Sequence, residues 1–214
     1  DFSGQNLGPL DCKILAAEFE VFGVRGFIAT LASLAIGTNP IGSEGGAALV
    51  DAIKTSNLKT IDIGKPLPLQ ELYESDTADF ADSGMGAGQV VILSWWLTTS
   101  FAATIARVAL KGNFPCGRIS KYGNGQAPWL PGKEFDGWNM LCESFSKSST
   151  LTDLDLSDCY LGPQALTPLA KAISSMATVT SMNCLNNPLG EGVNELIRVF
   201  EETPRLRTLC GLEE

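Results

Sequence analysis

The side chains that could perform chemistry in this sequence are carboxylates, thiols and glycine-rich turns, because the chain contains no histidine. That absence excludes Ser-His-Asp and Cys-His catalysis and any metal site built on imidazole. Asp153 and Asp155 form a carboxylate pair that a strand would hold about 7 Å apart. Glycoside hydrolysis at such a pair also needs an enclosing pocket, which an open surface does not supply. We therefore predict a solvated pair.

Two glycine-rich segments match nucleotide-binding loops only in part. Residues 84–88 read GMGAG, but Gln89 stands where the dinucleotide motif requires its third glycine, and no βαβ unit with an acidic partner is evident. Residues 123–125 read GNG and lack the Lys-Ser/Thr pair of a phosphate-binding loop. The sequence therefore predicts no cofactor, no catalytic residue and no enzyme.

The six cysteines contain no C-x-x-C pair. Cys159, Cys184 and Cys210 fall in or beside the strand and turn positions of a repeated pattern, where a small apolar side chain fits. We predict buried, reduced thiols rather than disulfides or a metal site. Reduced thiols predict an intracellular compartment, cytoplasmic or organellar.

The elements that position these side chains are predicted by a recurring sequence pattern. It reads LTDLDLSDCYLGPQALTPLAKAI at residues 151–173, and related phrases occupy residues 31–53 and 179–200. Each copy has apolar residues in an L-x-x-L-x-L spacing, a turn with Asn or Cys, an apolar residue with Gly, and a helical pattern. Internal repetition of this kind determines the fold before any other signal.

The L-x-L spacing places two apolar side chains on one face of a short strand. The apolar residues that follow, such as Leu166, Leu169 and Ile173, recur at helical spacing. Strand and helix bury these faces against each other, and stacked units share one core. We predict an α/β fold of about seven to eight irregular repeats in a single domain over residues 1–214, with parallel strands on the concave face and helices on the convex face.

The pattern resembles the ribonuclease-inhibitor-like leucine-rich repeats, which also occur in the C-terminal parts of NOD-like receptors. Residues 31–53 and 151–200 carry the resemblance, and residues 1–19 and 65–113 follow it less closely. The resemblance implies a leucine-rich-repeat solenoid, or horseshoe, that binds other proteins. It implies no catalytic residues. The chain begins inside one strand pattern and ends just after another, so we expect either uncapped repeats or a segment of a longer protein.

The repeat frame is anchored at Leu156, the second leucine of L-x-L. Four of the seven intervals between equivalent positions are 27 or 28 residues, as is usual for this kind of repeat. The predicted equivalents are Phe2, Ile36, Ile63, Asp82, Leu110, Leu156, Cys184 and Gly211.

The interval from Ile63 to Asp82 is only 19 residues. Pro66 and Pro68 occupy the start of the expected helix, so we predict an irregular connector over residues 64–79, shortened and mostly extended on the outer face. An aspartate on a core position predicts either a small register shift or an irregular strand around Phe80.

The 46-residue interval from Leu110 to Leu156 holds about 18 extra residues beyond the usual repeat length. They predict an insertion loop over residues 116–132, because Gly, Pro and Asn dominate there. Arg118, Tyr122 and Trp129 lie on this loop, and such residues are typical of binding hot spots. The alternative is a surface insertion whose Trp129 folds back on the adjacent helix.

An apolar helix is predicted over residues 89–97. Gly, Gln, Ser and Thr interrupt the uncharged stretch around it, so no transmembrane span is expected. Its apolar residues surround the helix and cannot all face one core. Either Trp95 and Trp96 fill the gap left by the missing helix of the preceding repeat, or part of this helix is an exposed docking patch.

The chain is acidic, with a net charge of −9, and this disfavours nucleic acid as a partner. Alternate strand residues predict an inner face that is mostly small or polar and carries both signs of charge, which suits a protein partner. The inner-face residues expected to bind are Asp62, Arg107, Lys111, Asp153, Asp155 and Asn183.

We predict a non-enzymatic protein–protein interaction module or scaffold, an accessory subunit or recognition segment of a larger assembly. Its expected docking sites are the helix with Trp95 and Trp96 and the loop with Arg118, Tyr122 and Trp129. One alternative is capture of a ligand protein in the concave face, as an inhibitor or receptor does. Another is peripheral attachment to a membrane-protein complex through the apolar helix.

Overall fold

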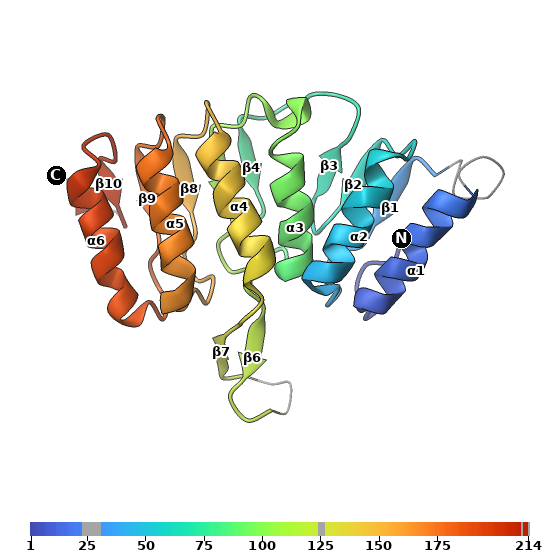
Figure 1. The fold of residues 1–214 in the computed structure, drawn as a ribbon, viewed down its shortest axis with the longest axis horizontal. Helices are drawn as coiled ribbons and strands as arrows, with labels where there is room; N and C mark the ends of the chain where they lie inside the picture. Colours follow the sequence, from blue (N-terminus) through green and yellow to red (C-terminus); the bar gives the residue numbers. More distant parts are fainter. Residues whose placement is uncertain (23–30, 124–126, 211, 214) are drawn as a thin grey trace.

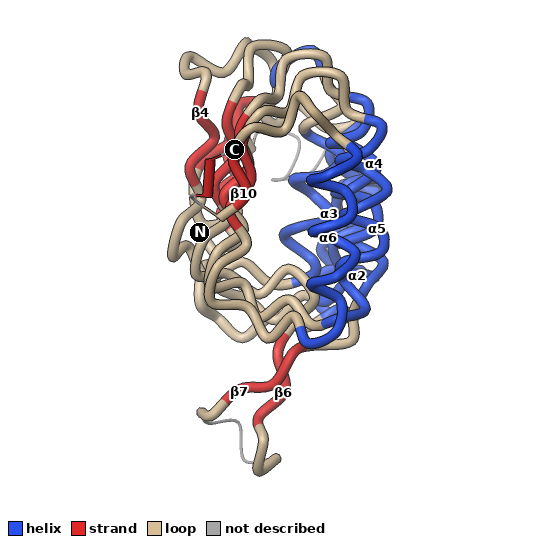
Figure 2. Tube along the Cα trace, turned by 90° about the vertical axis from the view of Figure 1, so that its left-hand side faces the viewer, coloured by secondary structure: helices blue, strands red, loops and turns tan. Residues whose placement is uncertain are grey.

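The computed structural model describes residues 1–22, 31–123, 127–210 and 212–213. Six helices of this part of the chain lie side by side in sequence order, with strands behind them (Figure 1). A view turned by 90° separates the strands on one side from the helices on the other (Figure 2). The molecule is therefore two layers, and the core lies between them.

The layers are built from short elements. The helices are α1 (Pro9–Phe22), α2 (Gly42–Lys54), α3 (Ala87–Trp96), α4 (Phe135–Lys147), α5 (Pro163–Ser175) and α6 (Val193–Glu202), with the 3-10 turns η2 (Ser100–Ala102) and η3 (Gly190–Gly192). The strands are β1 (Ser33–Ala35), β2 (Thr60–Asp62), β3 (Pro66–Pro68), β4 (Thr77–Asp79), β5 (Arg107–Ala109), β6 (Arg118–Ser120), β7 (Trp129–Pro131), β8 (Asp153–Asp155), β9 (Ser181–Asn183), β10 (Thr208–Leu209) and β11 (Leu212–Glu213).

The strands form one sheet of order β1-β2-β3, a second of order β11-β10-β9-β8-β5-β4, and a separate pair β6-β7. Neighbours from β4 to β10 are parallel, and their register sets Leu154 opposite Val108 and Met182. Leu154 is buried between flanking half-exposed aspartates, as alternation along a strand requires. The L-x-L prediction is thus confirmed in the second sheet.

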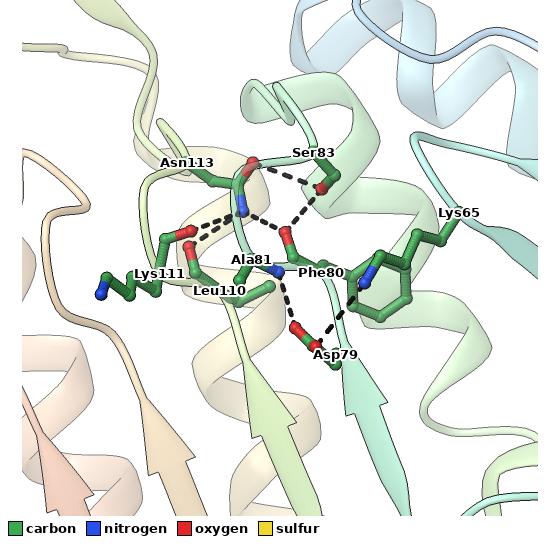
Figure 3. Close-up of polar contacts among 8 residues, drawn as sticks. All are labelled: Lys65, Asp79, Phe80, Ala81, Ser83, Leu110, Lys111 and Asn113. Atoms are coloured by element: carbon green, nitrogen blue, oxygen red, sulfur yellow. Dashed lines mark hydrogen bonds and ion pairs between the residues drawn. The ribbon is translucent and has the colours of Figure 1, made fainter.

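An asparagine side chain, buried or half-buried, follows each of several strands and stabilises the turn. The Asn113 amide donates to the carbonyls of Phe80 (2.6 Å) and Leu110 (2.9 Å) (Figure 3). Its own carbonyl accepts from Met85 N (2.8 Å). Asn39 and Asn187 make equivalent bonds in their turns. Because unpaired main-chain groups are costly inside a core, these side chains hold each turn against the preceding strand.

The register of β4 corrects the predicted frame. Ala78 pairs with Val108, so Phe80, and not Asp82, lies beside Leu110. Phe80 is 1% exposed, whereas Asp82 is exposed in a turn with φ of 53°. The small register shift, one of the two expectations for this strand, amounts to two residues. Gly211, the last predicted equivalent, lies outside the described residues.

The connector after β2 is extended and contains no helix, as predicted, but it does not lie on the outer face. Its strand β3 pairs antiparallel with β2 in the strand layer, with Leu67 opposite Ile61. Leu69 N donates to Lys59 O, so Pro66 and Pro68 occupy the positions whose main chain faces away from β2. Proline has no N–H, and the sheet accordingly stops at β3 instead of continuing to β4.

Helix α3 is buried on nearly all sides, which resolves its excess of apolar residues. Gly46 of α2 lies against the main chain of Gly88, and Gly137 of α4 lies against Ala87 O, so the three helices approach too closely for a side chain at these contacts. Trp96 is fully buried and donates from Nε1 to Pro68 O at 2.8 Å. Trp96 thus packs against the connector that stands in place of the missing helix.

The predicted insertion loop is an ordered hairpin. Strands β6 and β7 pair antiparallel and project away from the two layers (Figures 1 and 2). Residues 124–126 at its tip lie outside the described residues. The insertion predicted over 116–132 is present, and its described part contains two paired strands that its Gly, Pro and Asn content did not indicate.

Candidate functional site

Two surfaces contain the residues predicted to bind a partner: the exposed side of the strands, here called the strand face, and the β6–β7 hairpin. On the strand face Arg107 lies 3.8 Å from the Asp153 carboxylate across the β5–β8 pair. The Asp155 carboxylate accepts from Ser157 N (3.1 Å) and Ser157 Oγ (2.7 Å). Asn183 accepts from Leu185 N at 3.1 Å. These predicted residues do lie together.

Asp62 belongs to the other sheet. Its carboxylate also orders its own turn, because it accepts from Gly64 N at 2.8 Å. Between the two sheets, Lys65 Nζ lies 3.7 Å from the Asp79 carboxylate, which also accepts from Ala81 N at 2.9 Å (Figure 3). The sequence analysis did not predict this ion pair, because it placed the strand β4 two residues too late. The correct signal was the alternation around Phe80.

The strand face is therefore polar, with carboxylates that mainly order their own turns. Leu185, just beyond β9, adds an exposed apolar side chain, and Lys111 adds an exposed cation. A half-exposed ion pair such as Arg107–Asp153 contributes little net energy in water. This surface can orient a charged partner but offers few apolar anchors.

The hairpin is attached to the body through stacked side chains. The Arg118 guanidinium carbon lies 3.9 Å from the ring centroid of Phe114 on one side and 3.9 Å from that of Trp129 on the other. Phe114 in turn packs against Tyr160, with ring centroids 5.4 Å apart. Each cation–π contact of this kind contributes about 0.5–1 kcal/mol at an exposed site. Trp129 is thus partly covered by Arg118.

The hairpin also exposes apolar side chains that the sequence analysis did not single out. Ile119 and Leu130 are directly opposite each other and therefore share one face of the hairpin. Their exposed fractions are 42% and 43%, and Tyr122 toward the tip is 68% exposed. The predicted loop contained no paired strands. The sequence therefore did not indicate that Ile119 and Leu130 lie opposite each other.

The base of the hairpin is anchored to the body by main-chain contacts. Glu134 N donates to Cys116 O at 3.1 Å, and the Glu134 carboxylate accepts from Ser43 N at 3.3 Å in the first turn of α2. A negative charge is favoured there by the helix dipole. A side chain at Gly132 would collide with Cys116 O. The hairpin consequently leaves the body in a defined direction.

A cleft of about 460 Å³ lies between the hairpin and the turns that precede α2 and α3. Arg118, Trp129 and Phe114 line its hairpin side. Its other walls are formed by Thr38, Asn39, Pro40, Ile41, Gly42, Gly84, Gly86, Ala87, Gln89, Gly117 and Glu134. Volumes of this size accommodate several side chains of a partner or a small ligand.

The tryptophans of α3 take no part in either surface. Trp96 is fully buried and contacts Tyr73 edge-on at 5.4 Å between ring centroids, so its prediction as a partner-binding residue was wrong. Trp95 is half-buried on the helix side. The exposed docking patch expected as an alternative for this helix does not form, because α2 and α4 cover it on both sides.

The six thiols are free, and all but Cys210 are buried. Burial raises the pKa of Cys116 and of Cys159 to about 12, so both remain protonated at neutral pH. The Cys159 thiol lies 3.0 Å from Leu110 O, in the turn position that Asn113 and Asn187 occupy elsewhere. These thiols serve packing and turn formation and are poor nucleophiles.

Within the described residues, no three His, Cys, Asp or Glu side chains form a group that could hold a metal ion. The same part of the chain contains no helix of the length and apolarity that a membrane span needs.

Comparison with known families agrees with the repeat. The family model described as Leucine Rich repeat matches residues 28–50 and 147–170. No curated protein matches the chain significantly. The two matches support a leucine-rich repeat family, and the parallel strands and alternating helices are compatible with that fold. Leucine-rich repeat domains commonly bind other proteins through extended surfaces.

Proposed function

We propose that this protein is a non-enzymatic protein-binding module, and that its partner docks on the β6–β7 hairpin. The module is an irregular solenoid of about seven to eight leucine-rich repeats of the ribonuclease-inhibitor-like type. It serves as an accessory subunit or recognition segment of a larger assembly in a reducing, intracellular compartment. The six free thiols support that location.

The observation that carries the proposal is the exposed pair Ile119 and Leu130. These two side chains form an apolar surface on a hairpin that extends beyond the core, where water would otherwise cover them. A two-stranded hairpin is marginally stable by itself. Here the base contacts and the Arg118 stack hold it in place, so a partner meets a surface that is already ordered.

The strand face supports a second role, the orientation of a bound protein. Its charged residues, such as Arg107 and Lys111, are exposed beside the row that contains Asp155. Such charges affect the rate and direction of association more than its strength. Attachment through the apolar helix α3 lacks this support, since residues 87–94 are buried.

The test is recovery of the native partner with crosslinks mapped by mass spectrometry. We expect crosslinks at Lys121 and Lys133, beside the hairpin. The double variant Ile119→Ser/Leu130→Ser should recover at least tenfold less partner, because both apolar anchors are lost. The matched control is Met140→Ser/Ile197→Ser, which changes two equally exposed apolar side chains on α4 and α6.

Equal recovery by the hairpin variant and the control would contradict the proposal. Crosslinks confined to Lys59 and Lys111 would also contradict it, and would identify the strand face as the binding surface for a captured protein.

A further inference from the structure

The charge on the hairpin differs in sign from that of the whole chain. Residues 115–133 include Arg118, Lys121 and Lys133 and no acidic residue, whereas the complete chain has a net charge of −9. The hairpin is therefore a basic projection on an acidic molecule. A partner that meets this projection favourably presents negative charge.

Arg118 is the residue of this projection with the most defined geometry. Its guanidinium carbon lies over the rings of both Phe114 and Trp129, 3.9 Å from each ring centroid. The five N–H donors of arginine lie in the plane of the group, so stacking leaves their edge available. The Arg118 side chain is exposed as a whole, and partial desolvation of its guanidinium lowers its pKa.

Two other exposed arginines have acidic partners, and a third, Arg207, has no ion pair but also no aromatic ring stacked on it among the described residues. Arg107 is paired with Asp153, and Arg198 bonds to both Glu195 and Glu202. Among the described residues, Arg118 forms no ion pair with a carboxylate. A partly desolvated guanidinium with an open donor edge is a site where a carboxylate binds in bidentate geometry.

We propose, on the basis of the function proposed above, that the cleft beside the hairpin receives an acidic side chain of the partner protein, with Arg118 as its anchor. The cleft of about 460 Å³ accommodates that side chain and its neighbours. Gly86 and Ala87 at the amino end of α3 also line the cleft and add a favourable dipole for a negative group. Trp129 supplies apolar contact beside the carboxylate.

The chemistry favours a protein carboxylate over a nucleic acid or a membrane surface. A second hollow next to the cleft is lined by Lys133, by Glu44 in its ion pair with Lys13, and by Glu134 and Asp136. Glu134 and Asp136 would repel a polymer of phosphates or a sheet of anionic lipids. A single carboxylate flanked by apolar residues meets only Glu134, which also lines the cleft and whose carboxylate accepts from Ser43 N. Such a segment also suits the exposed Ile119 and Leu130 on the hairpin.

The experiment is a titration of the ¹⁵N-labelled full chain followed by NMR. The probe is an acetylated, amidated pentapeptide of alternating leucine and glutamate, and the second probe replaces each glutamate by glutamine. We expect the glutamate peptide to shift the Arg118 Nε–H and Trp129 indole signals with saturation, and to bind at least tenfold more tightly than the glutamine peptide. Vesicles of anionic lipid and a single-stranded oligonucleotide should leave both signals unchanged.

The variant Arg118→Gln should remove the preference for glutamate, whereas Arg107→Gln, with the same change of charge on the strand face, should keep it. Arg118→Lys keeps the charge without the planar fork and should lose most of the preference. Unchanged signals of the Trp138 indole, which is buried in the body, will show that each variant is folded.

Equal affinity for the two peptides, or equal effects of Arg118→Gln and Arg107→Gln, would overturn the inference, as would a saturable response to vesicles or oligonucleotide alone. A different result would refute the proposed function: Ile119→Ser/Leu130→Ser would recover as much native partner as its control variant does. Loss of native partner together with equal peptide affinities leaves docking on the hairpin intact and refutes only the acidic partner.

Discussion

On the strand face, Asp79 and Asp155 accept hydrogen bonds from main-chain N–H groups of their own turns, whereas on the hairpin Arg118 is stacked between two rings and has no carboxylate partner among the described residues. Apolar side chains show the same contrast. Trp96 is fully buried in the body, and Ile119 is largely exposed on the hairpin. The body uses its side chains for folding, and the hairpin keeps them available.

This contrast explains why residue type alone was a poor guide to the binding surface. Trp95, Trp96 and Trp129 all have the composition of a hot spot, but the fold buries the second completely and covers the other two in part. Substitutions in the body should therefore change stability, and substitutions on the hairpin should change association. Three predictions test this division.

The largest effect is expected for Trp96→Ala. It removes a fully buried ring and its hydrogen bond to Pro68 O, so the free energy of unfolding should fall by about 3–5 kcal/mol. Urea denaturation measures the change. The comparison variant is Trp129→Ala, which should cost about 1 kcal/mol or less because it removes only a stacked surface contact. Similar losses of unfolding free energy in both variants would contradict the distinction between body and hairpin.

An intermediate effect is expected for Asn113→Ala. The variant leaves the carbonyls of Phe80 and Leu110 and the N–H of Met85 without a partner, and it should cost about 2–3 kcal/mol in thermal or urea unfolding. Asn57→Ala, at an exposed position before β2, is the control and should be nearly neutral. A neutral Asn113→Ala would mean that water replaces the lost bonds.

The smallest effect is expected for Lys65→Gln. Its ion pair with Asp79 connects the two sheets, but both side chains are substantially exposed, so the loss should be about 0.2–0.5 kcal/mol. The difference from the native chain should disappear in 1 M salt, where such pairs are screened, as paired thermal scans at low and high salt can show. A larger, salt-independent loss would indicate that Lys65 packs against the sheet and does not act through its charge.

Much of the frame could be predicted from the sequence. Leu34 pairs in register with Ile61, and Val108 with Leu154, because their strands repeat the same apolar spacing. Phe80 was missed, since the frame relied on repeat length and the connector before it is two residues shorter than expected. Ile119 and Leu130 were missed because pairing across a hairpin depends on where the turn falls.

The sequence by itself determined the strand-turn-helix unit, its asparagine turns and the position of the insertion, because these follow from local spacing of apolar and turn residues. Only the tertiary structure decided which apolar side chains remain exposed. Burial depends on what packs against each element: glycine contacts with α2 and α4 enclose α3 and its Trp96, while nothing in the described chain covers Ile119 and Leu130. The same long-range packing brought Phe114, Arg118 and Trp129 into one stack.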